Sequence, residues 1–192
     1  MQRREPPGGR RAPQRRTKPL ILVVCASVRT ESDYLRGLRD HCGNPAVDIV
    51  LRKHGKAPTQ AIEYARKFVE RDPRSFDEVW CVVDVDDFDI GRAAKAAKQA
   101  KVSLAVSNPC FELWLLLHHA DCSSYCGGYA DVVARLQKHL PEYDKARLNF
   151  AHYRDHVEAA VERAKRLEPS GQDFGRNPST NVWRLVERIR EQ

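Results

Sequence analysis

Residues 78–87 read EVWCVVDVDD, in which an uninterrupted apolar run passes directly into a cluster of acidic residues. A continuous apolar run is typical of a strand that is buried on both faces of a parallel sheet. Residues 20–24 and 102–106 have the same character, and residues 47–51 also favour a strand. The sequence therefore predicts a sheet of about four strands.

Helical patterns separate these strands and fill the rest of the chain. Thr30, Asn108 and Asn177 have the residue types that cap helices, and a proline follows each of the two asparagines. Strands that alternate with helices predict an α/β fold with a parallel sheet flanked by helices and a helical C-terminal part. We expect helices at residues 31–41, 58–71, 91–100, 109–119, 131–139, 151–167 and 178–191.

Ligands of parallel α/β sheets bind at the carboxyl ends of the strands, which directs attention to residues 25–31 and 84–89. If the backbone stays extended, Asp84 and Asp86 point to the same side. Two neighbouring carboxylates repel each other, and a hard divalent cation such as Mg²⁺ or Mn²⁺ resolves that repulsion. The sequence thus predicts a metal site at Asp84 and Asp86. The alternative is an acidic loop that caps the helix near Gly91.

Glu112 lies in a run of apolar residues that must be largely buried. A buried carboxylate is unfavourable unless it is paired or bound to a cation. Either Glu112 turns toward the two aspartates, or it forms an ion pair with a nearby arginine. The residues alone leave both interpretations open.

The basic charge of the chain is concentrated at its N-terminus. Residues 1–18 hold seven basic residues and Glu5 alone, so they supply +6 of the formal net charge of +7. We interpret residues 1–18 as a disordered basic tail and residues 19–192 as one domain. No apolar run reaches the length of a membrane helix, and the N-terminus has no secretory signal, so we expect a cytoplasmic protein without a membrane partner.

The six cysteines do not favour disulfides in such a chain. His118, His119, Cys122 and Cys126 lie close in sequence and allow a zinc site as a minor alternative to ordinary packing. The chain has no phosphate-binding loop, no dinucleotide-binding glycine motif and no nucleophile elbow. Metal chemistry is therefore favoured over covalent catalysis.

Several motifs together resemble those of RloB-like proteins, which are bacterial proteins linked to restriction loci and abortive-infection phage defence. The motifs occur in family order across about residues 18–190. They are Thr30-Glu31 with Tyr34, the segment 80–88, the segment 107–118 (SNPCFELWLLLH) and the segment 177–182 (NPSTNV).

The resemblance implies a Toprim-like fold, in which a glutamate after the first strand and an Asp-x-Asp after the third hold Mg²⁺ for phosphodiester chemistry. The Asp-x-Asp corresponds to Asp84 and Asp86, and Glu112 and Asn108 match the central family motif. The resemblance also implies nuclease activity next to an ATPase of the AAA or ABC type that is encoded nearby.

One position departs from the family pattern. The family usually has Cys-Glu-Gly after the first strand, whereas this chain has Cys25-Ala26-Ser27. Three explanations are open: an engineered inactive variant, a natural member that has lost catalysis but still binds, or a contribution from Glu31 in place of the missing acid.

Two functions of different classes follow. The first is a metal-dependent nuclease effector of an anti-phage system that acts on RNA, including tRNA, or on DNA. Asp84, Asp86 and Glu112 would form its catalytic site. The second is a non-catalytic subunit that binds nucleic acid or a partner, and the sequence leaves the oligomeric state open. The candidate substrate-binding residues are Arg29, Arg52, Lys53 and Asn108.

Overall fold

A computed structural model describes residues 19–26, 29–51, 57–85 and 89–191 of the chain. The basic tail predicted at residues 1–18 lies outside these ranges, so the predicted domain boundary stays a prediction. Asp86, Arg52 and Lys53 also lie outside the described residues.

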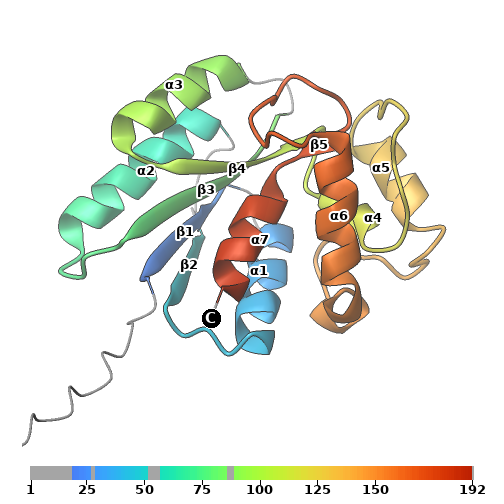
Figure 1. Cartoon of the computed structure of the whole chain (residues 1–192), viewed down its shortest axis with the longest axis horizontal. Coiled ribbons are helices and arrows are strands. Elements are labelled where there is room, and N and C mark those ends of the chain that lie inside the picture. The colour runs from blue at the N-terminus through green and yellow to red at the C-terminus, as the bar shows by residue number, and fades with distance from the viewer. Residues whose placement is uncertain (1–18, 27–28, 52–56, 86–88, 192) are drawn as a thin grey trace, which may run out of the picture.

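The centre of the fold is a five-stranded sheet with the order β2-β1-β3-β4-β5. The first four strands are parallel, and β5 pairs antiparallel with β4 (Figure 1). The architecture is therefore mixed α/β with a mostly parallel sheet, consistent with the Toprim-like arrangement that the resemblance implies. The strands are β1 (Ile21–Cys25), β2 (Val47–Leu51), β3 (Glu78–Asp84), β4 (Ser103–Asn108) and β5 (Ser179–Thr180).

Helices cover both faces of the sheet (Figure 1). The helices α2 and α3 lie on one face, and α1 and α7 lie on the other, with α4, α5 and α6 packed beside them. The helices are α1 (Thr30–His41), α2 (Pro58–Arg71), α3 (Ile90–Ala100), α4 (Glu112–Leu117), α5 (Tyr129–Leu136), α6 (Val157–Leu167) and α7 (Val182–Arg190), with the short 3₁₀ helices η1 (Phe150–His152) and η2 (Arg154–His156) before α6.

The side chains of β3 alternate between two apolar cores. Trp80 and Val82 belong to the core on the side of α1 and α7, whereas Cys81 and Val83 belong to the core on the side of α2 and α3. Both cores exclude water, so every residue from position 80 to position 83 is buried. This explains why the run in the sequence is continuously apolar rather than alternating. The same alternation places Asp84 on the face that carries α1 and α7.

The prediction of four strands was incomplete, because a fifth strand lies where a helix was expected to begin at Pro178. β5 has only two residues, and a strand that short has no recognisable pattern of its own. The buried side chain of Asn181 holds the segment in place: its Oδ1 accepts from the Val106 amide (2.5 Å), and its Nδ2 donates to the carbonyls of Leu104 (3.1 Å) and Gly171 (2.9 Å).

The three predicted helix caps were wrong for a common reason: their side chains make contacts distant in sequence. Asn108 ends β4 and donates to the Phe174 carbonyl, and Asn177 exchanges two hydrogen bonds with the backbone of Cys126. Thr30 is the first residue of α1, and its hydroxyl donates to the Lys145 carbonyl. As a result α4 and α7 begin later than predicted, at residues 112 and 182.

The predicted helix at residues 151–167 begins only at residue 157, because two 3₁₀ helices occupy its first turns. Within the described ranges, no helix is long and apolar enough to cross a membrane.

Candidate functional site

The carboxyl ends of β1, β3 and β4 meet at one edge of the sheet. β3 ends in Asp84, which lies beside Ser107 of β4 in the parallel register. Glu31 in the first turn of α1 and Glu112 in the first turn of α4 act, together with Asp84, on the charge of the Lys145 side chain. We call Glu31, Asp84 and Glu112 the carboxylate cluster.

Glu112 is the most deeply buried member of this cluster, with 1% of its surface exposed. Its Oε1 accepts a hydrogen bond from the Tyr143 hydroxyl (3.0 Å) and lies 3.5 Å from the Lys145 Nζ. Its Oε2 is also buried and has no hydrogen-bond partner among the residues that the structure describes. A buried carboxylate oxygen without a partner is unfavourable, so the position suits a bound cation.

Lys145 supplies the positive charge of the site. Its ammonium lies over the Tyr129 ring, 4.6 Å from the centroid, while nearly half of its side chain stays exposed. Burial acts to lower the pKa of Lys145, but the charges of Glu112, Tyr129 and the other two members of the carboxylate cluster outweigh burial and raise it. The Lys145 ammonium thus interacts electrostatically with all three carboxylates of the cluster.

The pKa of the Cys110 thiol provides a second sign that two members of the cluster lie close together. Burial raises this pKa most strongly, and the charges of Glu112 and Asp84 raise it further. Burial likewise raises the pKa of Tyr143, with Glu112 as the next cause. A raised pKa keeps the Tyr143 hydroxyl protonated at neutral pH, so it can donate its hydrogen bond to Glu112.

Glu31 is buried, with 2% of its surface exposed, and it lies in the first turn of α1. Burial raises the pKa of the Cys25 thiol, and the charge of Glu31 is the next cause. Glu31 therefore lies close to the carboxyl end of β1. The side chain of Ala26 instead packs with the apolar core beneath α2 and α3.

The other predicted site residues are placed less centrally. Arg29 is exposed and precedes α1. Asn108 is buried, and its amide donates to the carbonyls of Phe174 and Gly175. The Asp89 side chain accepts a hydrogen bond from the Arg92 amide and caps α3. This agrees with the alternative interpretation of the acidic loop as a helix cap.

Sequence reasoning missed Tyr143, Lys145 and Tyr129. These residues lie about 17 to 33 positions beyond Glu112, outside any recognised motif. No local pattern predicts such contacts. The only available signal was the prediction that a buried Glu112 needs a cationic partner, and the partner is a lysine rather than an arginine.

A zinc site at residues 118–126 does not form. His118 bonds to Tyr34 and to the Trp114 carbonyl, so both ring nitrogens are engaged away from the cysteines. Cys122 and Cys126 lie with their sulfurs 3.5 Å apart, and both are free thiols. The packing interpretation of these cysteines is confirmed by their burial.

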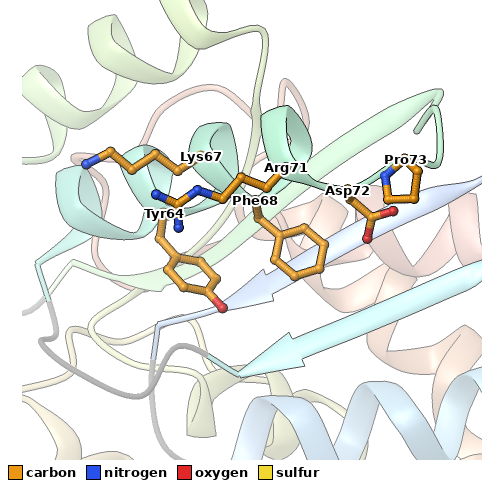
Figure 2. A pocket seen from close by; sticks show the side chains of 6 residues that line it. All are labelled: Tyr64, Lys67, Phe68, Arg71, Asp72 and Pro73. Atoms are coloured by element: carbon orange, nitrogen blue, oxygen red, sulfur yellow. The ribbon is translucent and has the colours of Figure 1, made fainter.

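A hollow of about 330 Å³ lies along α2, apart from the carboxylate cluster (Figure 2). The rings of Tyr64 and Phe68 lie side by side on one flank of the helix, with centroids 6.2 Å apart. The side chains of Lys67 and Arg71 extend along the helix beside them. Because its lining comes only from α2 and the two residues that follow, the hollow does not belong to the site.

The carboxylate cluster has the ligand chemistry of a divalent-metal site. The carboxylates of Asp84 and Glu112 are hard oxygen donors, which Mg²⁺ and Mn²⁺ prefer. The residues that the structure describes bring together no group of three histidine, cysteine or carboxylate ligands for a metal. The donor atoms of Asp84 and Glu112 thus suit a hard cation, but the described residues alone do not form a complete ligand set.

Comparison with known proteins places the chain in a family. A family profile described as "RloB-like protein" matches residues 21–189, which is most of the chain. Searches of the curated proteins and of the solved structures found no match. The matched region contains all four strands of the parallel sheet and the whole carboxylate cluster. The chain belongs to the RloB-like protein family.

Proposed function

We propose that the chain is a metal-dependent phosphodiesterase that cleaves RNA, including tRNA, or DNA. The observation that carries this proposal is the carboxylate cluster around Lys145 at the carboxyl edge of a parallel sheet. Carboxylates hold the metal ions of many phosphodiesterases, and an ammonium beside them suits a phosphate oxygen.

Each residue has a distinct role in this proposal. Asp84 and Asp86 would hold Mg²⁺ or Mn²⁺, and Glu112 would offer Oε2 as a further ligand. The chemistry that such an ion would supply is charge stabilisation of the phosphodiester and a lower pKa for a water nucleophile. Tyr143 fixes the rotamer of Glu112, and Lys145 binds the phosphate from its exposed side.

The biological setting is also proposed. Membership of the RloB-like family and its link to restriction loci support an effector of bacterial anti-phage defence in the cytoplasm. An AAA- or ABC-type ATPase encoded nearby would restrain this activity until infection.

A cleavage assay tests the proposal. The purified chain is incubated with total tRNA or plasmid DNA in Mg²⁺, Mn²⁺ or EDTA, alone and with the neighbouring ATPase and ATP. We expect cleavage that requires the metal and that falls at least about tenfold in Asp84→Asn, because one ligand charge is lost. Cleavage that persists equally in Asp84→Asn would exclude this site.

A non-catalytic binding subunit is the second candidate, and Ala26 favours it, because the family usually has glutamate at this position. In that case Asp84→Asn keeps nucleic-acid or partner binding, and neither protein cleaves under any of the conditions above.

Glu31 and Ala26 allow a further prediction about the missing acid. Glu31 is buried, and its charge acts on the pKa of Lys145, whereas the Ala26 methyl packs under α2 and α3. We expect Glu31→Gln to weaken Mn²⁺ binding by roughly 10- to 100-fold, and Ala26→Glu to leave it within about twofold. Isothermal titration with MnCl₂ measures both.

The opposite result, tighter Mn²⁺ binding in Ala26→Glu with no change in Glu31→Gln, would show that the missing metal-binding carboxylate belongs at position 26. Glu63→Gln serves as the matched control, because Glu63 is an exposed carboxylate on α2.

A further inference from the structure

The helix α3 has an unusual distribution of charge. It carries Arg92, Lys95 and Lys98, Lys101 follows directly after it, and it contains no acidic residue. All four cations are exposed, whereas Ala93 and Ala97 face the core. At 100° per residue, Lys95 points almost directly away from the buried side, and Arg92 and Lys98 flank it. We call Arg92, Lys95, Lys98 and Lys101 the α3 basic face.

Cations on the other helices are mostly neutralised by acidic partners. On α2, Arg66 pairs with Glu63 and Glu70. On α6, Lys165 pairs with Glu187. Across the ranges covered by the structure, no ion pair involves any member of the α3 basic face. Its positive charge is therefore available to a partner.

Stabilisation of the helix does not explain this pattern. Lys98 and Lys101 lie at the C-terminal end of α3, where cations interact favourably with the helix dipole. Arg92 lies in the first turn, where the same dipole disfavours a cation, and Lys95 lies in the middle. A face that is basic along its whole length suits an extended polyanion.

The position of α3 connects this face to the carboxylate cluster. α3 begins six residues after Asp84, so its first turn lies near the edge of the sheet where β3 ends. Arg92 and Lys101 are separated by nine residues, or roughly 13 Å along the helix axis. The basic face thus extends over a length that covers several phosphates of a nucleic-acid strand.

We propose that the α3 basic face binds the phosphate backbone of the nucleic acid whose phosphodiester enters the carboxylate cluster. The inference rests on the proposed function and deepens it, because it assigns the surface that holds the substrate. The contacts are with phosphates, so the face does not select a base sequence.

The test measures binding without catalysis. Fluorescence anisotropy with labelled single-stranded RNA and DNA oligonucleotides, in EDTA and at several salt concentrations, compares the full chain with Lys95→Ala/Lys98→Ala. Two lost phosphate contacts should make the slope of log K against log salt shallower by about 1.4 and weaken binding by roughly tenfold or more. The control Lys138→Ala/Arg154→Ala removes the same charge from exposed positions on the other layer.

Each outcome is decisive. Unchanged binding in the α3 variant, an equal loss in the control, or no binding by the full chain would overturn the inference. Thermal melting of all three proteins verifies that they are folded. If the α3 variant loses binding while the full chain cleaves nothing, phosphate binding by the α3 basic face is confirmed, but the proposal of cleavage at the carboxylate cluster fails. If the full chain cleaves nucleic acid but the α3 variant binds it as tightly as the full chain does, the nuclease proposal is supported and the α3 basic face is excluded as the binding surface.

Discussion

Glu112→Gln is expected to lower metal-dependent cleavage by about two to three orders of magnitude while the protein stays folded. Gln keeps an oxygen that accepts from Tyr143, so the packing around α4 is retained. It removes the charge next to Lys145 and replaces the buried Oε2 with an amide nitrogen, which cannot bind a cation. A loss of about 3–4 kcal/mol of transition-state stabilisation corresponds to that change in rate.

Single-turnover cleavage of a labelled tRNA measures this effect, and Mn²⁺ titration reports the loss of affinity separately. Glu142→Gln is the matched control, because Glu142 is exposed and lies next to Tyr143. A Glu112→Gln protein that cleaves as fast as the control would show that Glu112 only balances the charge of Lys145.

The four parallel strands and the first three helices could be predicted from the sequence, because burial on both faces makes β1 and the centre of β3 continuously apolar and leaves β2 and β4 mostly apolar. Pro58 and the Asp72-Pro73 pair set the limits of α2 as expected. β5 could not be predicted, since two residues carry no periodicity and the hydrogen bonds of Asn181 that hold the segment connect residues distant in sequence.

The candidate site was predictable only in part. Asp84 and Glu112 stood out because acids follow or interrupt apolar runs, and such acids need partners. Tyr143 and Lys145 come from the segment between α5 and η1, whose sequence is polar and has no recognised motif. Tertiary packing alone brings this segment to α4. For the same reason Thr30, Asn108 and Asn177, which resemble helix caps, instead form hydrogen bonds to backbone groups distant in sequence.

The free energy of unfolding should fall steeply below pH 6.5 because of His118. This histidine lies in the core beside α4, where its Nδ1 donates to the Trp114 carbonyl (2.9 Å) and its Nε2 accepts from the Tyr34 hydroxyl (2.9 Å). Burial lowers the pKa of His118 to about 3. A proton on Nε2 would face the Tyr34 hydroxyl as a second donor and would place a charge in an apolar core.

The sign of the effect follows from proton linkage. The unfolded chain binds a proton at His118 near pH 6.5, whereas the folded chain stays neutral until about pH 3. Between these values the unfolded state holds the extra proton. Stability is therefore fully present above pH 6.5 and decreases by about 1.4 kcal/mol for each pH unit below it, or about 3 kcal/mol at pH 4.5.

Urea unfolding between pH 7 and pH 4.5 measures this slope, and the difference between the chain and His118→Gln removes the contribution of groups common to both. The glutamine of this variant would keep an acceptor for Tyr34 but cannot titrate. Its free energy of unfolding should therefore fall less steeply than that of the chain, by about 1.4 kcal/mol per pH unit. His41→Gln, at an exposed position on α1, should retain the full slope. If the stability of the chain and of His118→Gln changed with pH in the same way, His118 would be protonated in the folded state. Water would then have access to the imidazole, either directly or through an opening of α4. The buried contact between α1 and α4, on which the placement of Glu31 and Glu112 depends, would then be looser than the structure implies.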